Sequence, residues 1–215
     1  MKLINLGGTD SLAKQFLAQV RDKEIQQDRM RFRKNVERLG EIMAYEVSKN
    51  LKYNPLTIET PLKRTSINQL QNQPVLITVL RAGLSYFQGF LNYFDDADAG
   101  FIGAYRKEST EEITINLDYL ATPRLDNRDV ILVDPMLATG KSFIRAVNEI
   151  VSRGAPKHLH LAALIASPEG IAYIEKNLKL PYTLYTFSID EHLDDHFYIV
   201  PGLGDAGDLS YGEKI

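Results

Sequence analysis

The sequence contains no cysteine, and this absence removes several classes of protein at once. A disulfide scaffold, a thiolate nucleophile and a zinc site built on cysteine are all excluded. Long apolar runs are missing too: the longest, such as residues 161–166, are far too short to cross a bilayer. The N-terminal segment MKLINLGGTD has no apolar stretch of the signal-peptide kind. We therefore expect a cytoplasmic protein that does not bind membranes.

A strong net charge is also missing. The formal charge is -3, so no global field attracts nucleic acid or an anionic membrane surface. With 215 residues, 44% of them hydrophobic and 25% charged, the chain has the composition of an ordinary soluble globular protein. An anionic substrate would therefore have to be held by a few local cations and backbone amides.

What the chain does contain is an alternation of apolar, β-branched runs with amphipathic helical segments. Strands are predicted at residues 75–80, 99–105, 129–134, 158–166 and 182–189, and helices at 10–20, 29–51, 84–93, 142–153 and 169–178. This order predicts an α/β fold with a mostly parallel sheet flanked by helices. Ligands of such sheets bind at the carboxyl ends of the strands, so the residues just after each strand are the first candidates for function.

Two segments depart from this alternation. Between Arg106 and Pro123, single apolar and polar residues alternate, which predicts an extended two-stranded β-arm. This arm is a surface hairpin, a flap over the site or a dimer contact. After Ile189 the periodicity stops and the chain becomes rich in glycine and aspartate. A tail of this kind is unusual unless it lines a site.

The strongest chemical signal is the segment 130–142. Four apolar residues predict a buried strand, Asp134 stands at its exit, and a short loop then opens a helix. Unpaired backbone N–H groups at a helix start, together with the helix dipole, attract a phosphate. Thr139 and Ser142 add hydroxyl donors, and the Asp134 carboxylate can accept hydrogen bonds from ribose hydroxyls. The segment can thus bind both ends of a ribose 5-phosphate.

A nucleoside-triphosphate-binding P-loop is the main alternative for the same residues. Gly140, Lys141 and Ser142 match the last three positions of that motif, but its first glycine falls on Pro135. Proline supplies neither an N–H group nor the conformational freedom of glycine. The P-loop interpretation is therefore disfavoured, as is a strand–loop–helix unit that binds nothing.

Five segments, in order along the chain, resemble motifs of the type I phosphoribosyltransferase family in its uracil-specific form. They are a pyrophosphate loop at 80–84, an arginine site at 104–108, the phosphoribosyl-pyrophosphate motif at 130–142 with Asp-Pro at its strand exit, a further family segment at 167–170 and a uracil loop at 198–208. The resemblance covers most of the chain. It implies a pentosyltransferase that converts uracil and phosphoribosyl pyrophosphate to UMP and pyrophosphate, a step of pyrimidine salvage.

The resemblance also assigns residues to roles. The residues implied to bind phosphoribosyl pyrophosphate are Arg81, Arg106, Asp134, Pro135, Met136, Leu137, Ala138, Thr139, Gly140, Lys141, Ser142 and Asp205. Those implied to bind uracil are Ile199, Gly204, Asp205 and Ala206, and those implied to act in catalysis are Arg106, Asp134 and Asp205. Mg²⁺ is the implied cofactor, contacted by Asp205 directly or through water. The implied partners are the two substrates, further copies of the chain (a dimer or higher) and GTP, which activates some relatives.

The chemistry of the residues agrees with these assignments. Arg81 and Arg106 follow neighbouring strands, and each guanidinium offers forked donors to phosphate oxygens. The glycine-rich loop 202–208 allows close backbone approach, so its N–H and C=O groups can match the polar edge of uracil. We therefore predict one domain over residues 1–215, with a core at about 72–190 and a hood formed by the N-terminal helices and residues 190–215.

Two departures and two rivals complete the prediction. Lys141 stands where the family usually has a second glycine, and the arm after Arg106 is only loosely similar, which leaves a GTP response open. One rival is a non-catalytic regulator of the same fold that binds nucleotide or RNA; it should carry a basic stripe and an eroded base loop, and neither is present. The other is a phosphoribosyltransferase for a different base.

His192 and His196 have the spacing of zinc ligands, but a polar turn is the better interpretation because the glutamate of the protease motif is missing.

Overall fold

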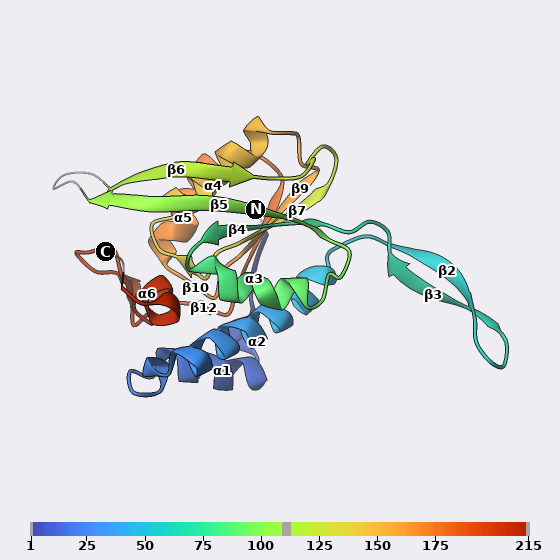
Figure 1. Cartoon of the computed structure of the whole chain (residues 1–215), viewed down its shortest axis with the longest axis horizontal. Coiled ribbons are helices and arrows are strands. Elements are labelled where there is room, and N and C mark those ends of the chain that lie inside the picture. The colour runs from blue at the N-terminus through green and yellow to red at the C-terminus, as the bar shows by residue number, and fades with distance from the viewer. Residues whose placement is uncertain (1, 109–112, 214–215) are drawn as a thin grey trace.

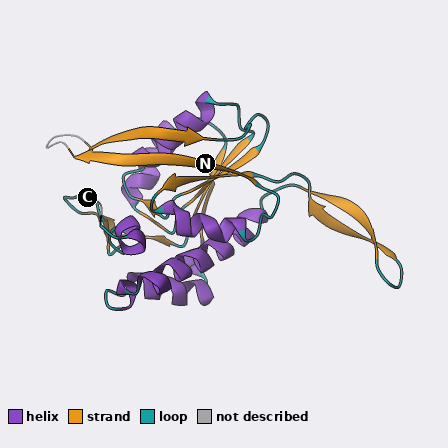
Figure 2. Ribbon diagram, viewed as in Figure 1, coloured by secondary structure: helices purple, strands orange, loops and turns teal. Residues whose placement is uncertain are grey.

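A parallel sheet forms the centre of the computed structural model, which describes residues 2–108 and 113–213 (Figures 1 and 2). Within these residues the main sheet has seven strands in the order β1-β11-β9-β7-β4-β5-β6. Their bounds are β1 Lys2–Asn5, β4 Val75–Leu80, β5 Asp98–Glu108, β6 Ile113–Ala121, β7 Asp129–Val133, β9 His158–Ala162 and β11 Tyr182–Thr186. All neighbours pair in parallel except β5 and β6. The predicted α/β fold is confirmed.

Helices cover both faces of this sheet. Their bounds are α1 Leu12–Arg21, α2 Arg29–Ser48, α3 Gly83–Leu91, α4 Lys141–Ser152, α5 Pro168–Asn177 and α6 Ala206–Tyr211, with short 3-10 turns η1 Leu6–Gly8 and η2 Ile25–Gln27. Along β7, Val130 and Leu132 pack towards α4 and α5, while Ile131 and Val133 pack towards α2 and α3. A strand buried on both faces needs apolar residues at every position, which explains the unbroken run in the sequence.

The two-stranded arm predicted after Arg106 is confirmed as the β5–β6 hairpin, whose pairs include Arg106 with Ile115. A second hairpin was not predicted. It consists of β2 (Tyr53–Glu59) and β3 (Arg64–Leu70) and extends away from the body (Figure 1). Nearly all of its residues are exposed. Because neither face packs against the core, the sequence has no regular alternation of apolar and polar residues that would predict two strands.

Two predicted strands are each divided in the structure. The strand predicted at 158–166 is β9 followed by β10 (Ile165–Ala166), and the one at 182–189 is β11 followed by β12 (Ser188–Ile189). The second pieces join β8 (Met136–Leu137) in a small parallel sheet of order β12-β10-β8 at the carboxyl ends of the main strands. This small sheet gives the segment that is predicted to bind phosphate a regular backbone support.

The chain ends also differ from the prediction. β1 joins the edge of the main sheet beside β11, although it lies outside the predicted core. The tail after Ile189, predicted to lack periodicity, contains the short antiparallel pair β13 (His192–Leu193) and β14 (Ile199–Val200) and then α6. Among the helices in residues 2–108 and 113–213, none has the length and apolar character that a membrane span requires.

Candidate active site

The phosphate loop, defined as residues 134–142, connects β7 to α4. Asp134 is buried at the exit of β7, and its Oδ1 accepts the N–H group of Met136 at 3.2 Å. Gly140 caps the start of α4 with a left-handed φ of +75°, and a Cβ there would lie 2.8 Å from the carbonyl oxygen of Gly170. Glycine is thus required by both conformation and space. The first-turn N–H groups of α4, including that of Ser142, have no carbonyl partner within the helix and can donate hydrogen bonds to an anion.

A second segment, residues 167–170, supports this loop from the side. Ser167 Oγ donates to the carbonyl oxygen of Ala138 at 2.7 Å, and the Ser167 N–H group donates to that of Leu137 at 2.9 Å. A Cβ on Gly170 would fall 2.2 Å from the Ala138 carbonyl oxygen. Residues 167–170 therefore fix the backbone that would surround a phosphate, which explains why this segment matches a family motif.

The pyrophosphate loop, residues 80–84, lies beside the start of the phosphate loop. Thr78 Oγ1 donates to the carbonyl oxygen of Val133 at 3.1 Å and so joins β4 to β7. A Cβ on Gly83 would be 2.2 Å from Thr78 Oγ1 and 3.1 Å from the Val133 carbonyl oxygen. This close approach places Arg81 and Asp134 at the ends of the neighbouring strands β4 and β7.

Arg81 is already engaged with the C-terminal segment. Its Nη2 donates to Asp208 Oδ1 at 2.8 Å and to the carbonyl oxygen of Gly212 at 3.2 Å. Its Nε is buried and has no hydrogen-bond partner among the described residues. Both side chains of the ion pair are more than a third exposed, at 39% and 35%. Solvent weakens such pairs to about 1 kcal/mol or less, so an arriving diphosphate can compete for this guanidinium.

The base loop, residues 199–206, runs from β14 into α6. Ile199, Leu203 and Ala206 are buried, whereas Gly204 is exposed. Asp205 caps α6, because its Oδ1 accepts the N–H group of Asp208 at 2.9 Å. For Asp205 the sequence predicts a contact to substrate and metal but not this helix cap. α6 also reaches the pyrophosphate loop, since a Cβ on Gly207 would lie 3.8 Å from Ala82 Cβ.

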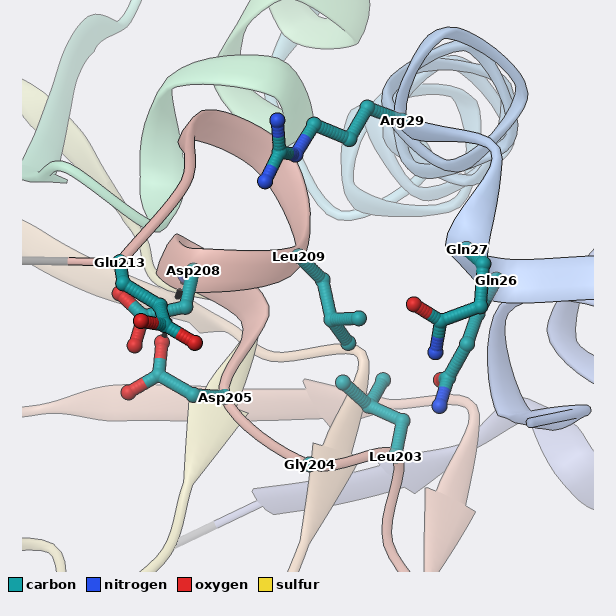
Figure 3. Close-up of a pocket in the computed structure, with 9 residues that line it drawn as sticks. All are labelled: Gln26, Gln27, Arg29, Leu203, Gly204, Asp205, Asp208, Leu209 and Glu213. Carbon is teal, nitrogen blue, oxygen red and sulfur yellow. Dashed lines mark hydrogen bonds between the residues drawn. The ribbon is translucent and has the colours of Figure 1, made fainter. Parts of the chain in front are cut away.

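A pocket of about 370 Å³ lies between the base loop and the N-terminal helices (Figure 3). It is lined by Gln26, Gln27, Arg29, Leu203, Gly204, Asp205, Asp208, Leu209 and Glu213. Arg29 lies on the α2 side, and Asp205, Asp208 and Glu213 lie together on the opposite side. None of these lining residues belongs to the phosphate loop. The pocket therefore lies between the base loop, α6 and the N-terminal segment and does not include the phosphate loop. We define the candidate site by the three loops.

The structure brings most of the predicted residues together and adds others. The pyrophosphate loop with Arg81 lies against the exit of β7, where the phosphate loop begins, and against α6, which directly follows the base loop. The side chain of Arg106 lies outside the described part of the structure. Three polar residues were not predicted: Asp208, which holds Arg81, and Arg21 and Asp190, which hold the base loop. No local sequence signal distinguishes them from ordinary surface charges.

The predicted Mg²⁺ fits the donor set as an ion that arrives with its substrate. Among the described residues, no group of three or more His, Cys, Asp or Glu side chains could hold a metal ion. Mg²⁺ needs no such cage, because it keeps several waters and binds through one or two carboxylates and the phosphates of a substrate. Asp134 and Asp205 supply carboxylates beside the loops that would hold those phosphates.

Comparison with known proteins agrees with this geometry. The sequence model of the family described as Uracil phosphoribosyltransferase matches residues 9–212. A uracil phosphoribosyltransferase of Porphyromonas gingivalis is 45% identical over 216 residues and covers 100% of both chains. One of Pyrococcus furiosus is 36% identical over 205 residues, which are 94% of this chain and 86% of that one.

Among solved structures, the AQ2163 protein from Aquifex aeolicus is similar with a TM-score of 0.87 and 32% identity, and the match covers 99% of each chain. These matches extend from the N-terminal helices through all three loops to α6. The chain belongs to the uracil phosphoribosyltransferase family.

Proposed function

We propose that this enzyme transfers the phosphoribosyl group of phosphoribosyl pyrophosphate to uracil. The bond between uracil N1 and ribose C1′ forms, the bond between C1′ and the pyrophosphate oxygen breaks, and N1 loses its proton. The products are UMP and pyrophosphate, and the proposed setting is pyrimidine salvage in the cytosol. The observation that supports this best is that the pyrophosphate loop contacts both the exit of β7, where the phosphate loop begins, and α6, which directly follows the base loop.

The protein would contribute mainly by holding the reactants in place. Backbone amides of residues 138–142, with the hydroxyls of Thr139 and Ser142, hold the 5′-phosphate, and Asp134 accepts from the ribose hydroxyls. The fixed backbone around Gly140 limits the motion of the ribose, so C1′ stays opposite the base nitrogen. Orientation of this kind can supply a large part of a barrier reduction without covalent chemistry from the protein.

Charge on the leaving pyrophosphate needs separate stabilisation. Arg81 and Arg106 are the proposed cations, and their effect grows as negative charge develops in the transition state. Mg²⁺ bound with the diphosphate would neutralise further charge there. Asp205 is the proposed contact to this ion or its water shell. Its cap to α6 uses Oδ1, so a contact through Oδ2 is compatible with the cap.

The polar edge of uracil would be read by the backbone of the base loop. Uracil presents C=O, N–H and C=O groups in sequence, which backbone groups near Ile199, Gly204 and Ala206 can complement. Adenine, guanine and hypoxanthine lack this pattern, and every purine has a larger, two-ring shape. We therefore propose that uracil is the base and that purines are excluded.

We also propose that the enzyme is a homo-oligomer and that the β2–β3 hairpin takes part in the assembly. The hairpin exposes Tyr53 (43%), Leu56 (46%), Ile67 (52%) and Leu62 (95%). Apolar side chains on a projecting hairpin favour contact with a second copy. Light scattering of the purified protein tests this, and a monomer at micromolar concentration would refute it.

GTP remains the proposed effector, to be tested by adding it to the assay for UMP formation.

The proposed reaction is tested by supplying Mg²⁺ and phosphoribosyl pyrophosphate with one free base at a time. Chromatography should detect UMP with uracil and no nucleotide with hypoxanthine or orotate. Equal conversion of either of these bases would refute the specificity. An absence of product with every base would refute the enzymatic function and favour a regulator.

A further inference from the structure

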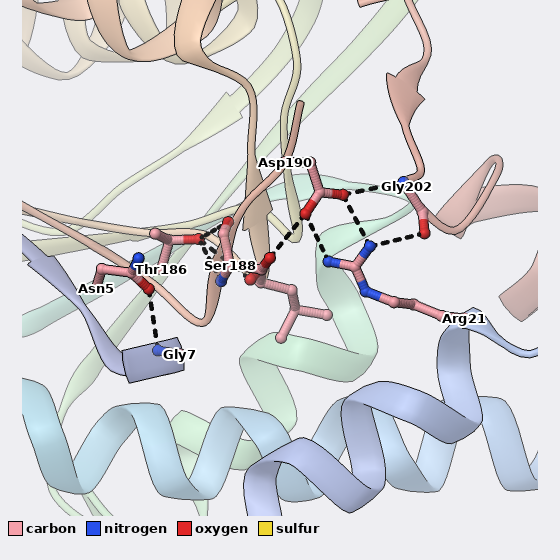
Figure 4. A network of polar contacts seen from close by, with 8 residues as sticks. Asn5, Gly7, Arg21, Thr186, Ser188, Asp190 and Gly202 are labelled. Carbon is pink, nitrogen blue, oxygen red and sulfur yellow. Dashed lines mark hydrogen bonds and ion pairs between the residues drawn. The ribbon is translucent and has the colours of Figure 1, made fainter. Parts of the chain in front are cut away.

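One residue of the base loop has both of its backbone polar groups held by side chains (Figure 4). The N–H group of Gly202 donates to Asp190 Oδ2 at 2.9 Å, and its carbonyl oxygen accepts from Arg21 Nη1 at 3.2 Å. Arg21 is the last residue of α1, and Asp190 directly follows β12. Two segments far apart in the sequence therefore meet at a single residue of the base loop.

Asp190 is the centre of this network. It is 7% exposed and accepts from Arg21 twice, at 2.8 and 2.7 Å, and from Ser188 Oγ at 2.7 Å. Burial raises the pKa of Asp190, but the hydrogen bonds from Arg21 and Ser188 and the charge of Arg21 outweigh it, so the pKa lies below its ordinary value. Its own N–H group donates to the carbonyl oxygen of Ala166 at 2.8 Å, which ties the network to the small sheet. The carboxylate is thus a fixed point rather than a mobile surface charge.

The turn at Gly202 transmits this anchoring to the base loop. Gly202 has a φ of +59°, and a Cβ there would lie 2.0 Å from the carbonyl oxygen of Ile199. Because the turn is this tight, a shift of Gly202 must move Ile199 before it and Gly204 after it. The side-chain amide of Gln26, with its nitrogen facing the loop, donates to the carbonyl oxygen of Leu203 at 3.0 Å. The N-terminal segment therefore holds two successive residues of the loop.

We propose that Arg21 and Asp190 are positioning residues for uracil. They fix Gly202 and so set the spacing of the backbone groups between Ile199 and Ala206 that face the base. The inference rests on the proposed base-binding role of this loop. Neither side chain belongs to the phosphate or pyrophosphate loop, so their effect falls on the base and not on phosphoribosyl pyrophosphate.

The test compares Arg21→Gln and Asp190→Asn with the wild-type enzyme. Each variant keeps the approximate size of the side chain and removes one charge of the pair. The KM of uracil is measured at saturating phosphoribosyl pyrophosphate, and the KM of phosphoribosyl pyrophosphate at saturating uracil. We expect the uracil KM to rise by about tenfold or more while the other KM stays within about twofold. Arg31→Gln is the matched control, because Arg31 lies in the next helix, α2, and forms an exposed ion pair with Asp28.

Arg21→Lys separates positioning from folding. It keeps the positive charge but loses the forked geometry, so it should fold and give a uracil KM between those of the wild type and Arg21→Gln. It also replaces the stronger variants if they do not fold. An unchanged uracil KM in folded variants, or equal rises of both KM values, would overturn the inference while UMP synthesis by the wild type still stands. If the wild type forms no UMP, the proposed function fails and the inference fails with it.

Discussion

The phosphate loop and the base loop are both proposed to hold a ligand with backbone groups, but they are built differently. The phosphate loop is one contiguous segment between a buried strand and a helix, and its neighbours hold it through backbone atoms and small residues. The base loop, although largely buried, is anchored by Asp190, 12 residues before Gly202, and by Arg21, 181 residues before it. The first loop is therefore defined locally and the second by long-range contacts.

This difference separates the two substrates physically. In the network at Asp190, the side chains of Arg21 and Asp190 bond to each other, to Ser188 and to Gly202, while the backbone N–H group of Asp190 bonds to Ala166 in the small sheet that also contains β8. A change in that network alters the base loop while β7, α4 and the 167–170 segment keep their hydrogen bonds.

Ser142→Asp should break the phosphate side most strongly. It places a carboxylate in the first turn of α4, where like charge repels the 5′-phosphate. We expect the KM of phosphoribosyl pyrophosphate to rise by about a hundredfold or more, equivalent to ~2.7 kcal/mol. Ser152→Asp at the far end of the same helix is the matched control and should leave this KM unchanged. An unchanged KM in Ser142→Asp would remove Ser142 from the phosphate site.

Asp205→Asn tests the residue that is proposed to contact both the base and the Mg²⁺–pyrophosphate group. Asparagine can also cap α6, so the fold should persist while the negative charge is lost. If the carboxylate supports Mg²⁺, kcat should fall by about tenfold and the Mg²⁺ concentration for half-maximal activity should rise. A normal kcat with an unchanged Mg²⁺ titration would show that Asp205 only caps the helix.

Lys141→Gly should have a small effect. Lys141 is exposed at the first position of α4, and the cradle consists of backbone groups. We expect kcat/KM to stay within about fivefold of the wild type, with a slightly less stable helix. A loss of about a thousandfold, or ~4 kcal/mol, would instead make Lys141 a principal phosphate ligand.

Acidification should leave the anchor of the base loop unaffected until the pH is very low. The pKa of Asp190 lies below the ordinary value of 3.8, so its stabilising effect is complete above that value and is lost as the pH falls through the lower folded pKa. Between about pH 5 and pH 8 the uracil KM should therefore show no step from Asp190. A step that is present in the wild type and absent in Asp190→Asn would contradict this assignment.

The same contrast explains how much of the site the sequence could predict. The phosphate loop was predictable because the apolar strand, Asp134 and the helix start are adjacent, and each has a local physical signature. Asp208 and Arg21 were not predictable. Their partners, Arg81 and Asp190, lie 127 and 169 residues away, and a charged residue on a short helix resembles a solvated surface charge. The resemblance to a family located the base loop but not the side chains that anchor it.

The fold follows the same rule. The core strands carry continuous apolar runs because both of their faces are buried. The β2–β3 hairpin lacks such a pattern because nearly all of it is exposed. β1 has only four residues, mostly exposed, and its place beside β11 is set by pairing with a strand at the other end of the chain.

The most direct test of the separation between the two loops is equilibrium binding of phosphoribosyl pyrophosphate, with Mg²⁺ and without base, to the Arg21→Gln variant. Calorimetry measures the affinity without any contribution from uracil or turnover. Because the hydrogen bonds of the Arg21 side chain go to Asp190 and Gly202, and the backbone bond from Asp190 to Ala166 does not require that side chain, the account predicts an affinity within about twofold of the wild type. An affinity weakened by about tenfold or more in a folded variant would show that the two loops are one coupled unit and would contradict it.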